Sequence, residues 1–303
     1  MTDPQLPEVI SERRQLINLA YRLLGSLAEA EDVVQETYAR WYALSERQRR
    51  EVAAPGAWLT TVASRICLDL LGSARARRER YVGEWIPEPV PGRSDEFGGP
   101  APADPADRVT LDESISMAFL IVLDSMTPAE RVAFVLHDVF RYPFADIAEV
   151  VGRTPAACRQ LASSARRRID TSKRPSGAER AEVVRDFKRA WETSDIEALI
   201  GLLDPEAIAT ADGGGLAVTF LDPIVGGERI ARAWLEIARN SAATLLERTV
   251  NGQPGLAAEL DGTIISVHAF DVADGRITRI WVIRNPEKLR LWTGAANHPR
   301  ADR

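Results

Sequence analysis

The sequence predicts a multidomain protein in which two all-α helical domains, the second a helix-turn-helix unit, precede an α+β domain. Apolar residues recur at helical spacing across residues 12–80 and again across residues 108–170. A segment rich in Pro, Gly and acidic residues lies between them, and strand-like alternation around Asp274-Gly275 marks the carboxy-terminal third. We expect domains at 1–84, 108–174 and 179–293, a flexible linker at 85–107 and a tail at 294–303.

The first domain is expected to contain three main helices. One ends at Gly25, and Ser26 with Glu29 forms a capping box for a second helix that runs to about Leu44. Its polar face carries Asp32, Gln35, Glu36 and Arg40. A third helix follows Pro55, with an apolar stripe made of Trp58, Leu59, Val62, Ile66 and Leu70. The outer face of that helix carries Thr61, Arg65, Asp69, Arg75, Arg77, Arg78 and Arg80.

The second domain ends in the helix-turn-helix, over residues 144–170. Gly152 interrupts the apolar pattern, and Thr154 and Pro155 are suited to the N-cap and first position of the next helix. Its polar face carries Arg159, Gln160, Ser163, Arg166 and Arg167. Residues 153–174 hold seven basic residues against one acid, a balance of +6, in a chain of net charge -6, so the other 281 residues sum to -12. A basic island in an acidic protein favours DNA binding over a merely solvated surface.

The third domain begins after a break at 171–179. Two amphipathic helices carry Phe187, Trp191, Ile196, Leu199 and Leu203; a DGGG loop at 212–215, a helix near 227–240 and a curled antiparallel sheet follow. His268 and Asp271 lie three residues apart on one expected strand, so they point to opposite faces and make a poor acid-base pair. Asp212 lies beside flexible glycines, which are poor supports for a general base. We therefore expect no enzyme.

The sequence does not show the patterns expected of a membrane protein, a secreted protein or a zinc-binding protein. The longest strongly apolar run is Met117 to Leu123, and the amino terminus does not resemble a signal peptide. We expect a cytoplasmic protein. Cys67 and Cys158 are the only cysteines, without zinc-ligand spacing, and are expected in the core. No pattern predicts a cofactor or a metal site.

Two helical units joined by a linker, the first with WLTTVASRICLDLL followed by arginines and the second with a helix-turn-helix, resemble the extracytoplasmic-function (ECF) sigma factors of bacterial RNA polymerase. The carboxy-terminal third resembles the SnoaL-like domain, a conical α+β barrel. WIPEPV at 85–90, DGGG at 212–215 and NPEKL at 285–289 together are similar to the SigJ type, which carries this extension. The resemblance implies core RNA polymerase and promoter DNA as partners.

The resemblance also implies roles for individual residues. Asp32, Gln35 and Glu36 would meet the polymerase clamp. Thr61, Arg65 and Asp69 would read the minus-ten element, with Arg75, Arg77, Arg78 and Arg80 holding phosphates; Trp58 suits this site too, but the core is the favoured place for it. Arg159 and Gln160 would read bases of the minus-thirty-five element, beside Ser163, whereas Arg166, Arg167 and Arg168 would meet phosphates. Ser164, Gly72 and Leu216 depart from the family pattern.

For the third domain we favour regulation in cis. The linker residues Trp85, Pro87, Glu88 and Pro89 would dock on an acceptor formed by Asp212, Gly213, Gly214, Gly215, Asn285, Pro286, Glu287, Lys288 and Leu289. The alternative is that these motifs are only a turn and a helix cap. A small ligand bound by this domain is a further partner that we consider. For the whole chain, the competing interpretation is a ligand-responsive helix-turn-helix regulator without a sigma role; an isomerase or cyclase would leave the basic island unexplained.

Overall fold

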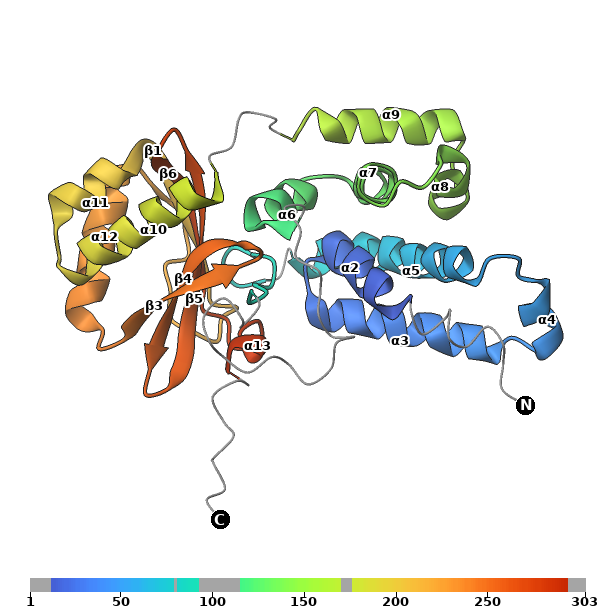
Figure 1. The fold of residues 1–303 in the computed structure, drawn as a ribbon, viewed down its shortest axis with the longest axis horizontal. Coiled ribbons are helices and arrows are strands. Elements are labelled where there is room, and N and C mark those ends of the chain that lie inside the picture. The colour runs from blue at the N-terminus through green and yellow to red at the C-terminus, as the bar shows by residue number, and fades with distance from the viewer. Residues whose placement is uncertain (1–11, 79–80, 93–114, 170–175, 294–303) are drawn as a thin grey trace, which may run out of the picture. The chain divides into compact units, whose positions relative to one another are not determined.

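The computed structural model describes residues 12–78, 81–92, 115–169 and 176–293 (Figure 1). The chain forms two compact units. Of the described residues, the first unit contains 12–78 and 119–169, and the second contains 81–92, 115–118 and 176–293. Within the described residues, no helix has both the length and the apolar character that crossing a membrane requires.

The first unit opens with the helices α2 (Arg13–Leu24), α3 (Leu27–Ala43), α4 (Glu46–Glu51) and α5 (Pro55–Arg78). Helix α2 ends at Gly25, which has a left-handed φ of 72° and donates its N–H to Tyr21 O. Ser26 then caps α3, accepting the Glu29 N–H at 3.3 Å. The buried side of α3 consists of the expected Ala30, Val33, Val34, Thr37 and Trp41.

Helix α5 differs from the predicted stripe. Its buried residues include Leu59, Ala63, Cys67 and Leu71, whereas the expected Val62, Ile66 and Leu70 are only half-buried. Helices α2, α3, α7 and α8 all contact α5. Small side chains such as Ala63 and Cys67 allow this close approach, so the most buried face is not the most apolar one.

The rest of the first unit comprises α6 (Met117–Asp124), which begins in the second unit, α7 (Pro128–Phe134), a π-helical turn η4 (Val135–Val139), α8 (Phe144–Val151) and α9 (Pro155–Arg166). The helix-turn-helix is confirmed. Gly152 ends α8 with a φ of 67°, and Thr154 caps α9, accepting the Ala157 N–H at 3.2 Å. Helix α9 buries Cys158, Ala162 and Ala165.

The second unit contains α10 (Gly177–Glu192), α11 (Ile196–Leu202), α12 (Gly227–Asn240) and α13 (Arg290–Thr293). Its strands are β1 (Leu203–Asp212), β2 (Ile224–Val225), β3 (Thr244–Val250), β4 (Gln253–Leu260), β5 (Thr263–Ala273) and β6 (Arg276–Ile283), in the order β2-β1-β6-β5-β4-β3. Asp274 and Gly275 form the expected hairpin, both with positive φ. The sheet is mixed rather than wholly antiparallel, because β1 returns beside β6 in parallel.

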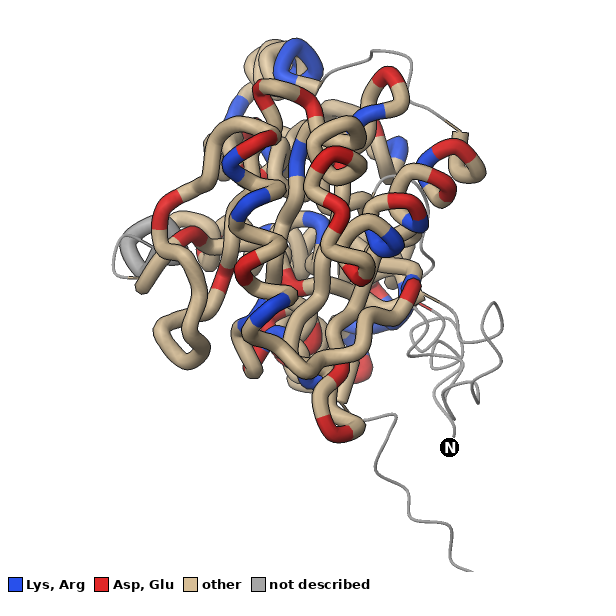
Figure 2. The backbone as a smooth tube through the Cα atoms, turned by 90° about the vertical axis from the view of Figure 1, so that its left-hand side faces the viewer, with Lys and Arg blue, Asp and Glu red and all other residues tan. Residues whose placement is uncertain are grey.

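The two faces of this sheet have different covers. Helices α10, α11 and α12 pack on one face (Figure 1), around a core that includes Phe187, Trp191, Trp234 and Phe270. In Figure 2, Lys and Arg alternate with Asp and Glu over the side of the protein that includes these helices, as ion pairs such as Arg232–Glu228 illustrate. The other face buries Val267 and Ala269.

Part of the expected linker belongs to the second unit. Residues 86–90 are buried, and Pro91 forms an isolated antiparallel bridge with Val250 at the end of β3. Ile115, just before α6, is also completely buried. The segment therefore differs from the flexible linker that its Pro-rich composition suggested, because its backbone is bound by the barrel. The remainder of that linker, 93–107, lies outside the described residues.

Candidate functional site

Asp212, the last residue of β1, lies at the centre of a polar site and is fully buried. Its Oδ1 accepts a hydrogen bond from the Tyr81 hydroxyl at 2.7 Å. Its Oδ2 accepts the Ile86 N–H at 3.0 Å and pairs with Lys288 Nζ at 2.6 Å. Both carboxylate oxygens are thus engaged by donors, as a buried charge requires.

Lys288 binds the second backbone group of Ile86. Its ammonium group donates to the Ile86 carbonyl as well as to Asp212, and it lies 4.3 Å from the centre of the Trp85 ring. One ion pair therefore binds both backbone groups of a single linker residue. Removing one partner of such a pair leaves an uncompensated buried charge, which costs about 3–5 kcal/mol.

The glycine motif allows a close approach beside this ion pair. Gly214 has a φ of 61°, and a Cβ there would overlap the Asn285 side chain. Asn285 Nδ2 donates to the Tyr81 hydroxyl at 2.8 Å, so Tyr81 bridges Asn285 and Asp212. Burial, with the hydrogen bond to Asp212, raises the pKa of Tyr81. The hydroxyl consequently stays protonated and can donate.

Asn251 makes a second set of contacts and is fully buried. Its side-chain Oδ1 accepts the Val90 N–H at 3.0 Å, its backbone N–H donates to Val90 O at 2.8 Å, and its Nδ2 donates to Ile115 O at 3.0 Å. Its φ of 51° places it in the turn between β3 and β4. A single asparagine thus binds both Val90 in the linker and Ile115 just before α6, on either side of residues 93–114.

Most of the predicted regulatory residues meet here. Asp212 and Lys288 bind the linker directly, at Ile86, whereas Asn285 binds Tyr81, which precedes the linker. The Lys288 ammonium lies over the Trp85 ring, and Pro89 O accepts the indole N–H of Trp292 at 2.8 Å. The other buried members of the predicted set are Pro87, Glu88, Gly213 and Leu289. Gly214 is half-buried, whereas Gly215, Pro286 and Glu287 are exposed.

Sequence reasoning missed Tyr81, Asn251 and Trp292. Asn251-Gly252 is a recognisable hairpin-turn dipeptide, so a turn could have been predicted there, although not its contact with the linker. No local signal distinguishes Tyr81 or Trp292, because their roles depend on contacts between segments distant in sequence.

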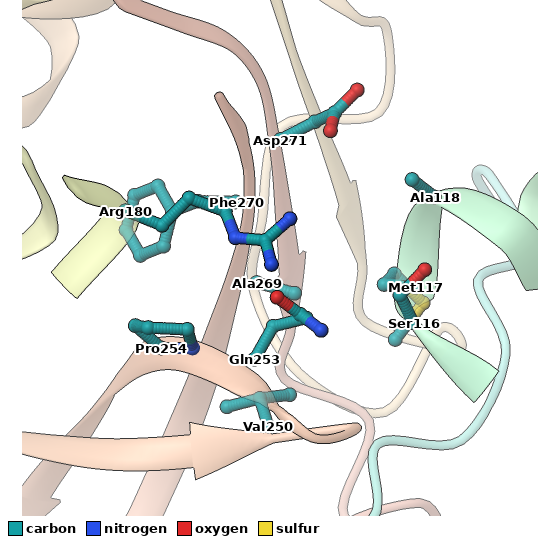
Figure 3. Close-up of a pocket in the computed structure, with 10 residues that line it drawn as sticks. All are labelled: Ser116, Met117, Ala118, Arg180, Val250, Gln253, Pro254, Ala269, Phe270 and Asp271. Carbon is teal, nitrogen blue, oxygen red and sulfur yellow. The ribbon is translucent and has the colours of Figure 1, made fainter. Parts of the chain in front are cut away.

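A small pocket with mixed polar and apolar lining lies beside the start of α6 (Figure 3). It is lined by Ser116, Met117, Ala118, Arg180, Val250, Gln253, Pro254, Ala269, Phe270 and Asp271. Figure 3 shows the Arg180 guanidinium pointing towards the Gln253 amide. The cavity of about 10 Å³ suits a single water molecule. A small ligand of this domain therefore stays a prediction.

His268 lies on the helix-covered face of the sheet, beside Trp191 and Trp234. Its Nε2 is 3.0 Å from Ser266 Oγ, and burial lowers the pKa of the imidazole to about 3. Asp271 lines the pocket on the opposite face. The two side chains are not brought together, as the strand alternation predicted.

The predicted polymerase-binding residues are accessible. Asp32, Gln35 and Glu36 are exposed on α3, where Glu36 pairs with Arg40 at 2.8 Å. On α5, Arg65 and Asp69 are exposed and Thr61 is half-buried. The side chains of Arg75, Arg77 and Arg78, and the whole of Arg80, lie outside the described residues.

Within the first unit, α5 also contacts the helix-turn-helix. Arg65 Nη2 donates to Glu149 O at 3.0 Å, near the end of α8, and the Tyr142 hydroxyl donates to Thr60 Oγ1 at 2.9 Å. Trp58 packs against the buried Trp41, with ring centres 5.2 Å apart, but is itself only half-buried.

The predicted DNA-facing residues of α9 and its carboxy-terminal end are all exposed: Arg159, Gln160, Ser163, Arg166, Arg167 and Arg168. Two of these arginines also make hydrogen bonds within the unit. Arg166 binds Asp138 through Nε at 2.6 Å, and Arg168 donates to Ser125 O at 2.7 Å. Ser164, which departs from the family pattern, donates to Glu130 at 2.9 Å.

Comparison with known proteins agrees with this organisation. Residues 9–77 match the family model for Sigma-70 region 2, and residues 116–169 match that for Sigma-70 region 4. The ECF RNA polymerase sigma factor SigJ of Mycobacterium tuberculosis is 37% identical over 301 residues, which cover 94% of this chain and 93% of SigJ. The probable ECF RNA polymerase sigma factor SigI of the same species is 35% identical and covers 95% of both chains.

The fold is similar as well. The crystal structure of the Mycobacterium tuberculosis extracytoplasmic function sigma factor SigJ aligns with a TM-score of 0.74 at 36% identity, covering 94% of this chain and 98% of that one. The two helical domains and the SnoaL-like barrel are thus confirmed as the architecture. With likeness in sequence and fold over nearly its whole length, the chain belongs to the extracytoplasmic-function family of RNA polymerase sigma factors.

Proposed function

We propose that this sigma factor directs core RNA polymerase in the cytoplasm to promoters with two elements, and that its barrel regulates this activity by binding the linker. In this proposal α3 contacts the polymerase through Asp32, Gln35 and Glu36. Helix α5 engages the minus-ten element and α9 reads the minus-thirty-five element. The exposed positions of these polar residues support the assignment.

The proposed regulation rests on one observation, the two hydrogen bonds to the backbone of Ile86. The Asp212–Lys288 ion pair binds its N–H and its carbonyl, so release of the linker would break two hydrogen bonds to charged groups. Because the linker and the barrel belong to one chain, docking is intramolecular, and even a weak interface populates the docked state.

Docking shortens the connection between the two DNA-binding regions. From Arg78 to Met117 the free chain has 39 residue steps and could span about 130 Å at ~3.4 Å per residue. In the docked state Asn251 holds both Val90 and Ile115. Only the 12 steps from Arg78 to Val90 and the two steps from Ile115 to Met117 then remain free, which is about 48 Å of extended chain. The path from Val90 through the Asn251 carboxamide to Ile115 adds about 8 Å. Docking therefore shortens the greatest distance that the connection can span by roughly 70 Å.

The promoter elements make this loss significant. Their names place them about 25 base pairs apart, which is roughly 85 Å along the duplex at ~3.4 Å per base pair. The helical regions add the same length in both states, so the docked connection always has the shorter reach. We therefore propose that docking restrains promoter engagement and that undocking releases it.

The experiment compares wild type with Asn251→Ala in run-off transcription with core RNA polymerase on a promoter library. We expect transcripts whose promoters share two elements. We expect severalfold higher output from Asn251→Ala, because its side-chain contacts with Val90 and Ile115 are lost. Asn240→Ala is the matched control, since Asn240 is exposed and its side chain binds Glu236 of its own helix. Transcription from Asn251→Ala at the wild-type level, with an intact fold, would refute regulation by docking; no transcription from wild type would refute the promoter role.

A further inference from the structure

Phe144, the first residue of α8, is a half-buried aromatic residue beside the recognition helix. Its ring stacks on the His137 imidazole, with centres 4.0 Å apart and planes at 12°. The guanidinium carbon of Arg159, on α9, lies 5.1 Å from the centre of the same ring. The ring thus connects the π-helical turn η4 with an exposed arginine of α9.

The same turn also holds the other end of α9. Asp138 binds Arg166 through two hydrogen bonds, Nε to Oδ1 at 2.6 Å and Nη2 to Oδ2 at 3.1 Å. His137 Nδ1 lies 3.2 Å from Arg166 Nη2. Single π-helical turns within helices are often found at functional sites. Here the turn contacts Arg166 directly, through His137 and Asp138, and reaches Arg159, seven residues earlier on α9, through the Phe144 ring that stacks on His137.

The two arginines are held in different ways. Carboxylate pairing occupies the Nε and Nη2 N–H groups of Arg166, which leaves fewer of them for acceptors on DNA. Among the described residues, no carboxylate lies within ion-pair distance of Arg159. Its contact with Phe144 is with the face of a ring, and stacking leaves the N–H groups at the edge of a guanidinium available for other acceptors.

We propose that Phe144 is a positioning residue that orients Arg159 for reading a guanine in the major groove. The inference rests on the proposed role of α9. An arginine side chain carries about 2 kcal/mol of rotamer entropy, so holding it before DNA arrives reduces the loss on binding. Guanine presents O6 and N7 as two acceptors that match the guanidinium edge.

The test uses holoenzyme assembled from the full chain and core RNA polymerase. A promoter library randomised across the minus-thirty-five region is transcribed by wild type, Arg159→Ala, Phe144→Leu and the double variant, and base preference is measured at each position. Phe144→Tyr keeps the aromatic ring. Phe140→Leu is the matched control, because it removes a nearby aromatic ring whose cationic neighbour is Arg22 instead of Arg159.

We expect Arg159→Ala to abolish a guanine preference of roughly tenfold or more at one position. Phe144→Leu should reduce the preference at that same position at least threefold, leaving the other positions unchanged. The double variant should match Arg159→Ala, since an absent arginine cannot be positioned. Phe144→Tyr and Phe140→Leu should keep the wild-type preference.

The proposal is overturned if Phe144→Leu keeps the preference that Arg159→Ala abolishes, or weakens all positions equally in a folded protein. It is also overturned if Arg159→Ala changes no base preference, although α9 could then still read the element through Gln160. These outcomes differ from failure of the proposed function, in which wild-type holoenzyme would transcribe no member of the library.

Discussion

Replacing Tyr81 by Phe should weaken linker docking while keeping the ring in place. The substitution removes one hydroxyl, which donates to Asp212 at 2.7 Å and accepts from Asn285 at 2.8 Å. A hydrogen bond to a charged group contributes about 1.5–3 kcal/mol. Since about 1.4 kcal/mol corresponds to a factor of ten, the undocked population should rise roughly 10- to 150-fold.

Amide hydrogen exchange measures this population directly. The Ile86 N–H binds Asp212 and the Val90 N–H binds Asn251, so both exchange when the linker leaves the barrel. In Tyr81→Phe both amides should exchange faster by the same factor, whereas amides in β5 should keep their protection. Tyr38→Phe is the control, because Tyr38 lies on α3 in the first unit. Unchanged protection of Ile86 would refute the reasoning.

Four further predictions concern the same chain. The pKa of His268 is about 3 in the folded protein and about 6.5 in the unfolded protein, so as the pH falls only the unfolded state takes up a proton at this residue. Chemical denaturation should therefore give an unfolding free energy about 1 kcal/mol lower at pH 5.5 than at pH 7. The variant His268→Gln should not show this pH-dependent loss. Burial raises the pKa of both thiols, so Cys67 and Cys158 should react with a thiol reagent only after unfolding. Thr154→Ala should cost about 1 kcal/mol of unfolding free energy by removing the cap of α9. Gly214→Ala should accelerate exchange of linker amides, because its φ is positive and a Cβ would displace Asn285; normal exchange rates there would contradict the close approach.

The local signals in the sequence predicted most of the fold. Gly152, Thr154 and Pro155 mark the turn and the start of α9 as observed, and helix α12 occupies the predicted 227–240. Such features depend on backbone preferences of neighbouring residues, which a sequence displays directly. The parallel pairing of β1 with β6 depends on strands about 70 residues apart, and no local pattern specifies it.

The candidate site was predictable only in part. The motifs indicated an acceptor for the linker, and two of its predicted residues, Asp212 and Lys288, do bind Ile86. Tyr81 and Asn251 act through contacts with residues 131 and 161 positions away, respectively, in sequence. The buried face of α5 also differs from the predicted one, because helices that are distant in sequence, from both helical regions, contact it.

The most direct test of linker docking follows the Ile86 and Val90 amides through promoter engagement. Hydrogen exchange would be measured for the free chain, for holoenzyme and for holoenzyme on a promoter selected from the library. We predict strong protection of both amides in the free chain and its loss in the promoter complex, while β5 stays protected. Equal protection of the linker amides in the free chain and in an active promoter complex would contradict release of the linker as the regulatory step.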